Sequence, residues 1–169
     1  MTDIIKPYDI MILSGGFDPV HRGHVRMFNE AKTLATFVVV GVNSDDWLIR
    51  KKGKPFMNWA ERAEIIGSFK SVDRVMNFDD TDGTACSLIV HVKNVAAAML
   101  NTNFMVYRGE SLKRPLRIAF GNGGDRSKQG SIPSKEAVVC AELGVDLIGG
   151  VGGEDKVQSS SWLIKASKE

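Results

Sequence analysis

The sequence predicts an α/β fold: a doubly wound, five-stranded parallel sheet with helices on both faces. Residues 37–42, F-V-V-V-G-V, form an unbroken, β-branched apolar run. Such a run is typical of a central parallel strand that is covered on both sides. Runs of this kind alternate along the chain with segments of helical apolar spacing, and this alternation predicts a parallel sheet with helical crossovers.

Short apolar runs predict the strands. Four of them are residues 10–13, 37–42, 72–78 and 145–148. Two further apolar runs are residues 104–107 and 117–120. Apolar character alone does not show which of them is the remaining strand of the sheet.

Helices are predicted between the strands from apolar spacing and from start and stop signals. The first expected helix begins after His24 and ends at about Ala35. Three more run from Asn58 to about Phe69, from Thr84 to Leu100 and from Ile132 to about Leu143, and a last helix begins at Ser159 to Ser161. Asn58 with Glu61 three positions later fits a capped helix start. Gly144 ends the fourth of these helices. The basic stretch 50–54 is expected to be a loop that ends at Pro55.

The length of 169 residues suits one domain, and we expect residues 1–169 to form it. The net charge of +2 gives no argument for nucleic-acid binding, which usually needs a strong basic excess. Small anions are the expected partners, and the local basic cluster at 50–54 is one place for them.

The expected location is the cytoplasm. Cys86 and Cys140 are the only cysteines, they lack metal-site spacing, and we expect both to be buried, reduced thiols. The first nine residues lack the apolar core of a signal peptide, and no apolar run approaches the length of a membrane span.

Residues 14–24, S-G-G-F-D-P-V-H-R-G-H, lie where the first strand gives way to the first helix. Unpaired N–H groups and the helix dipole favour an anion at such a helix start. Gly15 and Gly16 let the backbone approach a bulky ligand, and His21 and His24 fall on one face of the first turn. Ser159 to Ser161, at the last helix start, could form a second anion site.

This stretch resembles the H-x-G-H signature of the cytidylyltransferase-like nucleotidyltransferases, with His21 to His24 as H-R-G-H and Gly15 to Pro19 ahead of it. The resemblance implies a Rossmann-like fold. It also implies transfer of a nucleoside monophosphate from a nucleoside triphosphate to a phosphate acceptor, with release of pyrophosphate. Residues 42–45 (V-N-S-D) and 123–125 (G-G-D) resemble the adenylyltransferases that make ADP-heptose.

The resemblance also assigns site residues. His21 and His24 are expected to stabilise the transition state. Lys54 is expected to be a further catalytic group, and it is chosen from the three lysines Lys51, Lys52 and Lys54. Arg62 is expected to share phosphate and acceptor contacts with Lys54. The expected nucleotide-binding residues are Gly15, Gly16, Phe17, Asp18, Gly123, Gly124, Asp125, Ser159, Ser160 and Ser161. In this family a strand leads into the Gly-Gly-Asp turn, so residues 117–120 become the fourth strand, and the role of Asn101 to Leu116 stays open.

The expected cofactor is Mg²⁺, carried by the triphosphate, with Asp18 as the one candidate protein contact and no dedicated metal site. A zinc site at His21 and His24 lacks a third ligand nearby. The expected partners are a nucleoside triphosphate, ATP slightly favoured, and a phosphorylated sugar or polyol. No nucleic acid or membrane is expected, and a homodimer is possible because relatives commonly pair.

Three alternatives stay open. A glycerol-3-phosphate cytidylyltransferase that uses CTP belongs to the same class. A catalytically silent nucleotide-binding module would keep the fold, although both histidines argue against it. A truncated aminoacyl-tRNA synthetase core would share H-x-G-H, but the chain lacks a KMSKS-like segment.

Overall fold

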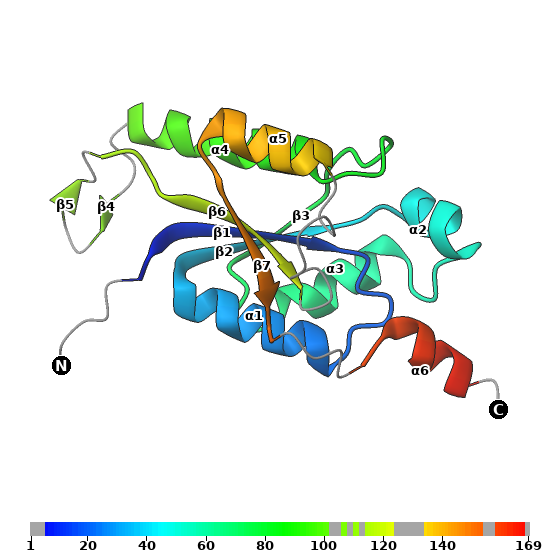
Figure 1. The fold of residues 1–169 in the computed structure, drawn as a ribbon. Helices are drawn as coiled ribbons and strands as arrows, with labels where there is room; N and C mark the ends of the chain where they lie inside the picture. The colour runs from blue at the N-terminus through cyan, green and yellow to red at the C-terminus, as the bar shows by residue number, and fades with distance from the viewer. Residues whose placement is uncertain are drawn as a thin grey trace.

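A five-stranded parallel sheet forms the centre of the molecule (Figure 1). The computed structural model describes residues 6–101, 106–107, 110–111, 114–123, 134–153 and 158–167. The strands of this sheet are β1 (Tyr8–Gly15), β2 (Ala35–Val42), β3 (Arg74–Met76), β6 (Ile118–Gly123) and β7 (Asp146–Val151). Their order is β3-β2-β1-β6-β7, and every neighbouring pair is parallel. The predicted fold class and all five predicted strands are confirmed.

Helices cover both faces of this sheet. They are α1 (Arg22–Leu34), α2 (Asp45–Lys52), α3 (Trp59–Gly67), α4 (Cys86–Asn101), α5 (Ser134–Leu143) and α6 (Ser160–Ala166). Helices α1 and α3 lie on one face and α4 and α5 on the other, whereas α2 and α6 lie beyond the edge where the strands end (Figure 1).

Alternating side chains of β1 supply the two halves of the core. Met11 and Leu13 are fully buried with Phe28 of α1 in one cluster. Ile12 is fully buried with Leu88 of α4 in the other. Successive residues of a strand point to opposite faces, so an unbroken apolar run is what a strand with two covered faces requires.

Helix α2 was not predicted. The basic stretch expected to be a loop begins in its last turn, which carries Arg50, Lys51 and Lys52. Its first turn is acidic, so both ends complement the helix dipole. The Ser44 side chain accepts a hydrogen bond from the Trp47 N–H as the N-cap, and Gly53 follows the last turn with φ 89°. Ser44 and Gly53 are start and stop signals that could have revealed this helix.

The segment 101–116 contains a second, small sheet. Strands β4 (Val106–Tyr107) and β5 (Glu110–Ser111) pair in antiparallel fashion and are not part of the parallel sheet. The apolar run 104–107 therefore contributes a strand, although residues 104 and 105 lie outside the described residues. The fourth strand of the main sheet is β6, as the sequence predicted.

Both cysteines lie in helices, as expected, and both are free thiols. Cys140 is buried, whereas Cys86 is only half-buried. Burial raises the pKa of the Cys140 thiol to about 11, with a smaller contribution from Glu136, so this group is neutral at physiological pH. Among the described helices, none combines the length and apolar character needed to cross a bilayer.

The chain reverses its direction of travel across the sheet next to β1. It passes from β1 to β2 and β3 on one side, and then returns to β6 and β7 on the other. In open α/β sheets, ligands bind outside the carboxyl ends of the strands at such a switch point. The fold thus places the candidate site between β1 and β6, where α1 begins.

Gly41 allows close packing between β2 and α4. A Cβ atom at Gly41 would lie 2.3 Å from Leu88 Cδ2 and 2.9 Å from Phe78 Cε1. We expect Gly41→Ala to lower the free energy of unfolding by about 1–3 kcal/mol in urea denaturation, because overpacking forces neighbouring side chains to shift. Gly67→Ala is the matched control, since its Cβ would meet only Val75 Cγ2, at 3.6 Å. Equal stabilities of the two variants would contradict this packing argument.

Candidate active site

A cavity of about 300 Å³ opens at the carboxyl edge of the sheet. Its wall comes from the turn after β1, the first turns of α1, one side of α2, the ends of β6 and β7, and the start of α6. The predicted site residues that line it are Gly15, Gly16, Phe17, His21, His24, Gly123, Ser159, Ser160 and Ser161. The described residues that line this cavity include no Asp or Glu, whereas Lys51 and Lys52 are among them. The cavity therefore suits an anion.

The turn after β1 packs tightly against the protein's own side chains. A Cβ atom at Gly15 would lie 2.9 Å from Phe17 Cζ, and one at Gly16 would lie 3.0 Å from Leu48 Cδ2. Phe17 has a positive φ of 50°, which is uncommon for a residue other than glycine. The two glycines are thus needed for internal packing, and the ligand approach that the sequence suggested stays a prediction.

His21 and His24 form a stacked pair at the start of α1. Their ring centroids are 3.7 Å apart, and the ring planes differ by 23°. His21 Nδ1 accepts a hydrogen bond from the Gly23 N–H, and His24 Nδ1 accepts one from the His21 N–H, each at 3.2 Å. Because Nδ1 accepts in both rings, each neutral imidazole carries its proton on Nε2. Nε2–H is the group that can donate to a phosphate oxygen.

His24 is neutral at physiological pH. Burial, followed by the nearby His21 and Lys52, lowers the pKa of its imidazole to about 3. Phe17 packs edge-on against this ring with centroids 4.9 Å apart, which adds to the burial. His24 can therefore act as a hydrogen-bond donor of fixed orientation, but it does not carry a positive charge into the site.

Lys52, rather than Lys54, lies in the cavity. Its Nζ donates to the backbone carbonyl of Asp18 at 2.9 Å. Burial lowers the pKa of Lys52, Asp18 raises it and Arg62 lowers it further. Lys52 and Lys54 are both exposed, but Lys54 does not line the cavity, so the structure favours Lys52 over the predicted Lys54. Lys52 belongs to the last turn of α2, whereas Lys54 lies beyond the end of that helix.

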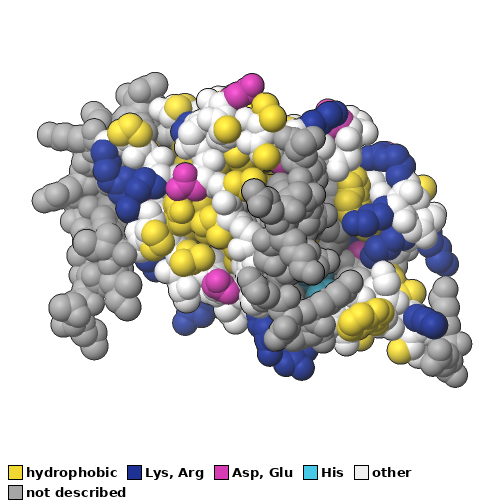
Figure 2. Space-filling view, viewed as in Figure 1, with side chains coloured by type: hydrophobic (Ala, Val, Ile, Leu, Met, Phe, Trp, Pro, Cys, Tyr) yellow, Lys and Arg dark blue, Asp and Glu magenta, His cyan; other side chains and the backbone are white. Residues whose placement is uncertain are grey.

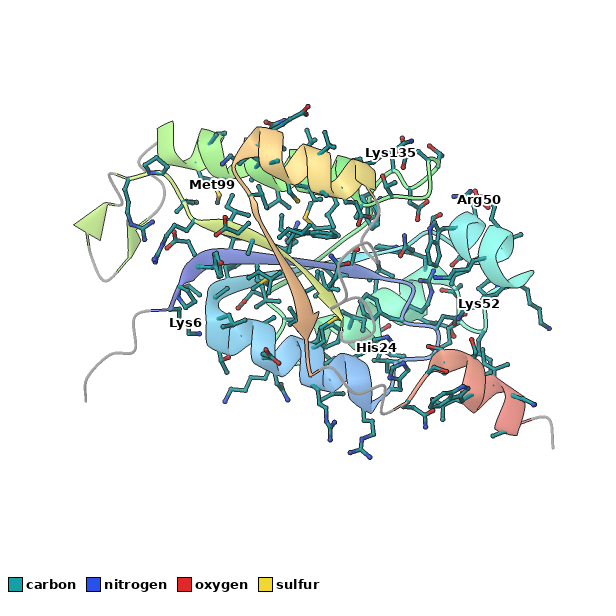
Figure 3. The ribbon with its side chains drawn as sticks, in the orientation of Figure 1. Lys6, His24, Arg50, Lys52, Met99 and Lys135 are labelled. Atoms are coloured by element: carbon teal, nitrogen blue, oxygen red, sulfur yellow. The ribbon has the colours of Figure 1, made fainter. Side chains whose placement is uncertain are left out.

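The side chains around this site can be followed in two views. Figure 3 shows His24 at the start of α1 and Lys52 at the end of α2, on the side of the sheet edge where α6 also lies. In the space-filling view, a histidine surface is recessed, and lysine and arginine side chains gather on the α2 side of it (Figure 2).

Asp18 is buried away from the cavity. Its Oδ2 accepts a hydrogen bond from the Phe56 N–H and its Oδ1 accepts one from the Met57 N–H, both at 2.8 Å. Both carboxylate oxygens are thus used to hold the segment before α3 against the turn after β1. This geometry argues against the predicted contact of Asp18 with nucleotide or magnesium. Within the described residues, no cluster of three or more His, Cys, Asp or Glu could hold a metal ion.

Arg62 is also fully buried, and its guanidinium holds the site together from behind. Nε donates to the Met57 carbonyl at 3.1 Å. Nη1 donates to the carbonyls of Gly16 and Asn43 at 2.7 and 2.9 Å. Nη2 pairs with the Asp45 carboxylate. Arg62 does not line the cavity, so the predicted phosphate contact is replaced by a structural role.

The serines join α6 to the turn after β1. Ser159 is the N-cap of α6, and its side chain accepts a hydrogen bond from the Trp162 N–H at 3.2 Å. Ser160 Oγ donates to the Pro19 carbonyl at 2.8 Å. The predicted helix start is confirmed. Of the predicted Gly-Gly-Asp turn, Gly123 lines the cavity, while Gly124 and Asp125 lie outside the described residues.

Sequence reasoning missed several residues of the cavity wall. They include Met27, Trp47, Leu48, Asn122 and Gln158. Trp47 and Leu48 belong to α2, so recognising that helix from Ser44 and Gly53 would have placed them near the site. Asn122 lies two residues after the predicted strand 117–120, and the end of a parallel strand is the signal that could have found it.

Comparison with known proteins identifies the family of this chain. The family model described as cytidylyltransferase-like matches residues 12–121, well over half of the chain. The chain belongs to the cytidylyltransferase-like family of nucleotidyltransferases. The match starts inside β1 and ends inside β6, so it includes the histidine pair and α2.

Curated relatives within this family carry the name bifunctional protein HldE. The one from Geotalea uraniireducens is 40% identical over 73 residues, which are 42% of this chain and 15% of the relative. The one from Pelobacter propionicus is 36% identical over 86 residues, 50% of this chain and 17% of the relative. The matched segments thus span less than a fifth of the relatives' length.

Two solved structures share the cytidylyltransferase-like fold. The lipopolysaccharide core biosynthesis protein from Thermoplasma volcanium has a TM-score of 0.56 and 22% identity, over 84% of this chain and 95% of that one. A bifunctional NMN adenylyltransferase/ADP ribose pyrophosphatase from Francisella tularensis, complexed with AMP and a manganese ion, has a TM-score of 0.59 and 18% identity. That match covers 94% of this chain and 41% of the other.

The depressed pKa of His24 predicts a loss of stability in mild acid. The pKa is about 3 in the folded protein, against an ordinary 6.5, so between these values the unfolded chain binds the extra proton. The contribution of His24 is present above pH 6.5 and is lost as the pH falls toward 3. Between pH 7.5 and 5.5, we expect the free energy of unfolding to fall by about 1 kcal/mol more in the wild type than in His24→Asn, by urea denaturation. Parallel pH profiles would show that His24 is not held neutral.

The buried contacts of Arg62 predict that its replacement strongly lowers the stability of the protein. We expect Arg62→Met to lower the free energy of unfolding by about 3–5 kcal/mol, because it leaves buried carbonyls and the Asp45 carboxylate without their donor. Arg50→Met is the matched control in urea denaturation. The Arg50 side chain is half-exposed, donates to the Asp80 carbonyl at 2.8 Å and lies 3.7 Å from the Asp80 carboxylate, so its loss should change stability by about 1 kcal/mol or less. A mild effect of Arg62→Met would contradict the structural role.

Proposed function

We propose that this protein transfers a nucleoside monophosphate from a nucleoside triphosphate to a phosphorylated sugar or polyol and releases pyrophosphate. The observation that carries the proposal is the stacked His21 and His24 pair, in which Nδ1 of each ring accepts a backbone hydrogen bond and Nε2–H is the donor that each ring can offer to a ligand. It lies with Lys52 in a cavity whose described lining contains no carboxylate. Family membership points to the same chemistry.

The proposed reaction is an in-line displacement at the α-phosphorus. An oxygen of the acceptor phosphate attacks, a new P–O bond forms, and the bond to the departing pyrophosphate breaks. The attacking oxygen is already ionised at neutral pH, so no protein base is needed. The Nε2–H groups of His21 and His24 donate to phosphate oxygens as their charge shifts, and the Lys52 ammonium offsets the total negative charge.

Magnesium fits this site as a companion of the triphosphate. Since the described cavity wall carries no carboxylate, the ion would be held through phosphate oxygens, with few or no protein ligands. When bound, it would neutralise part of the phosphate charge. The binding work of the chain itself falls to the histidine pair, Lys52 and the backbone of the turn after β1.

ATP and a heptose phosphate are the favoured substrates. The sequence resembles the adenylyltransferases that make ADP-heptose, and curated relatives share the name bifunctional protein HldE. The cytidylyl alternative, with CTP and glycerol 3-phosphate, fits the same geometry. The silent-module alternative is disfavoured because the histidine pair and Lys52 meet in one cavity.

The test is pyrophosphate release with ATP, CTP, GTP and UTP, each combined with heptose 1-phosphate, hexose 1-phosphates and glycerol 3-phosphate. We expect turnover with one triphosphate and one acceptor class. His24→Asn can keep an acceptor for the His21 N–H but lacks the Nε2 donor, so kcat should fall by about 10²–10³. His24→Gln, whose amide nitrogen can replace Nε2, should retain more of the rate.

Variants of Lys52 and Lys54 test which lysine acts in the site, Lys52 as the structure indicates or Lys54 as the sequence predicted. Lys52→Met should lower kcat/KM strongly, whereas Lys54→Met should change it little, because Lys52 lines the cavity and Lys54 does not. The opposite result would restore Lys54 to the site. Absence of turnover with every pair, combined with tight triphosphate binding in calorimetry, would favour the silent binding module.

A further inference from the structure

We propose that Trp47 and Lys51 of α2 form the acceptor subsite, and that the acceptor is a cyclic sugar phosphate whose ring packs against the indole. This inference rests on the proposed function and names its substrate class. The indole is a flat apolar surface in a cavity wall otherwise rich in glycine, serine, histidine and lysine.

The indole is held beside the turn that faces the phosphates. A Cβ atom at Gly16 would lie 3.4 Å from Trp47 Cζ3, so the ring edge reaches the backbone of the turn after β1. Lys51, one helical turn further on, places its Nζ 4.3 Å from the centroid of the indole ring. An aromatic surface and an ammonium group thus lie together at the cavity wall, next to the proposed site of phosphoryl chemistry.

The start of α2 is fixed from behind, so the backbone that carries the indole is positioned before any ligand binds. The Trp47 N–H donates to Ser44 Oγ at 3.0 Å. Ser44 in turn donates to the buried Asp80 carboxylate, through Oγ at 2.7 Å and through its N–H at 2.8 Å. A preorganised aromatic wall loses little conformational freedom on binding, which favours affinity.

The position of α2 assigns this wall to the acceptor rather than to the nucleotide. The switch point, where a nucleotide binds in such sheets, lies between β1 and β6. Helix α2 follows β2, on the other side of β1 from β6 and β7. The attacking group must approach from the side opposite the departing pyrophosphate, and α2 offers a wall on that other side of the cavity.

The chemistry of this wall favours an acceptor that contains a sugar ring. Lys51 Nζ lies over one face of the indole. The C–H face of a sugar ring can pack on the other face, while its hydroxyl or phosphate groups reach Lys51 and Lys52. Glycerol 3-phosphate has no ring and would leave the indole without a matching surface. The wall therefore favours a sugar phosphate over the polyol alternative.

The experiment compares Trp47→Leu, Trp47→Phe and Lys51→Met in pyrophosphate release, with heptose 1-phosphate and glycerol 3-phosphate as acceptors. We expect Trp47→Leu to raise KM for heptose 1-phosphate by about tenfold, with KM for the triphosphate unchanged. Trp47→Phe should recover most of this loss, and Lys51→Met should raise the same KM by about threefold. Trp162→Leu is the matched control, since Trp162 is 53% exposed and does not line the cavity.

Three outcomes would overturn the inference while leaving the transferase intact. They are a rise in KM for the triphosphate in Trp47→Leu, an equal loss with both acceptors, and preferred use of glycerol 3-phosphate. If the wild type releases no pyrophosphate at all, the proposed function fails instead. The subsite is then tested by tryptophan fluorescence. Quenching by heptose 1-phosphate in the wild type but not in Trp47→Phe would support the subsite, and quenching in neither or in both would overturn it.

Discussion

The site depends on one buried cation. The guanidinium of Arg62 reaches the turn after β1, the end of β2, the segment before α3 and the first turn of α2. Burying a charge is costly unless it is paired and hydrogen-bonded, and here three carbonyls and the Asp45 carboxylate meet this requirement. The shape of the cavity wall follows from that satisfied network.

Acidic and basic side chains lie on opposite sides of this wall. Asp18, Asp45 and Asp80 use their carboxylates to fix backbone and side chains behind the cavity. The described lining residues on the ligand side include Lys51 and Lys52, and no acidic side chain faces them there. The acidic groups therefore stiffen the frame without repelling an anion, because they lie outside the space that a triphosphate would occupy.

The neutral state of His24 is part of the same arrangement. Its Nδ1 is used in the capping of α1, and burial keeps the ring uncharged. One side chain thereby closes a helix terminus and presents a donor of fixed direction to the cavity. Phosphoryl transfer asks for positioning and charge stabilisation more than for proton transfer, so a neutral, oriented donor suits it.

The sequence by itself determined the sheet, most helices and the histidine pair. These features can be recognised locally because their signals extend over only a few residues. The signals are the spacing of apolar residues, helix caps such as Asn58 with Glu61, and the glycines before His21. Only the tertiary structure decided what the charged groups do. The contacts of Lys52 with Asp18, and of Arg62 with Gly16, join residues 34 and 46 positions apart. A charged side chain shows its type in the sequence, but its partner is chosen by the fold.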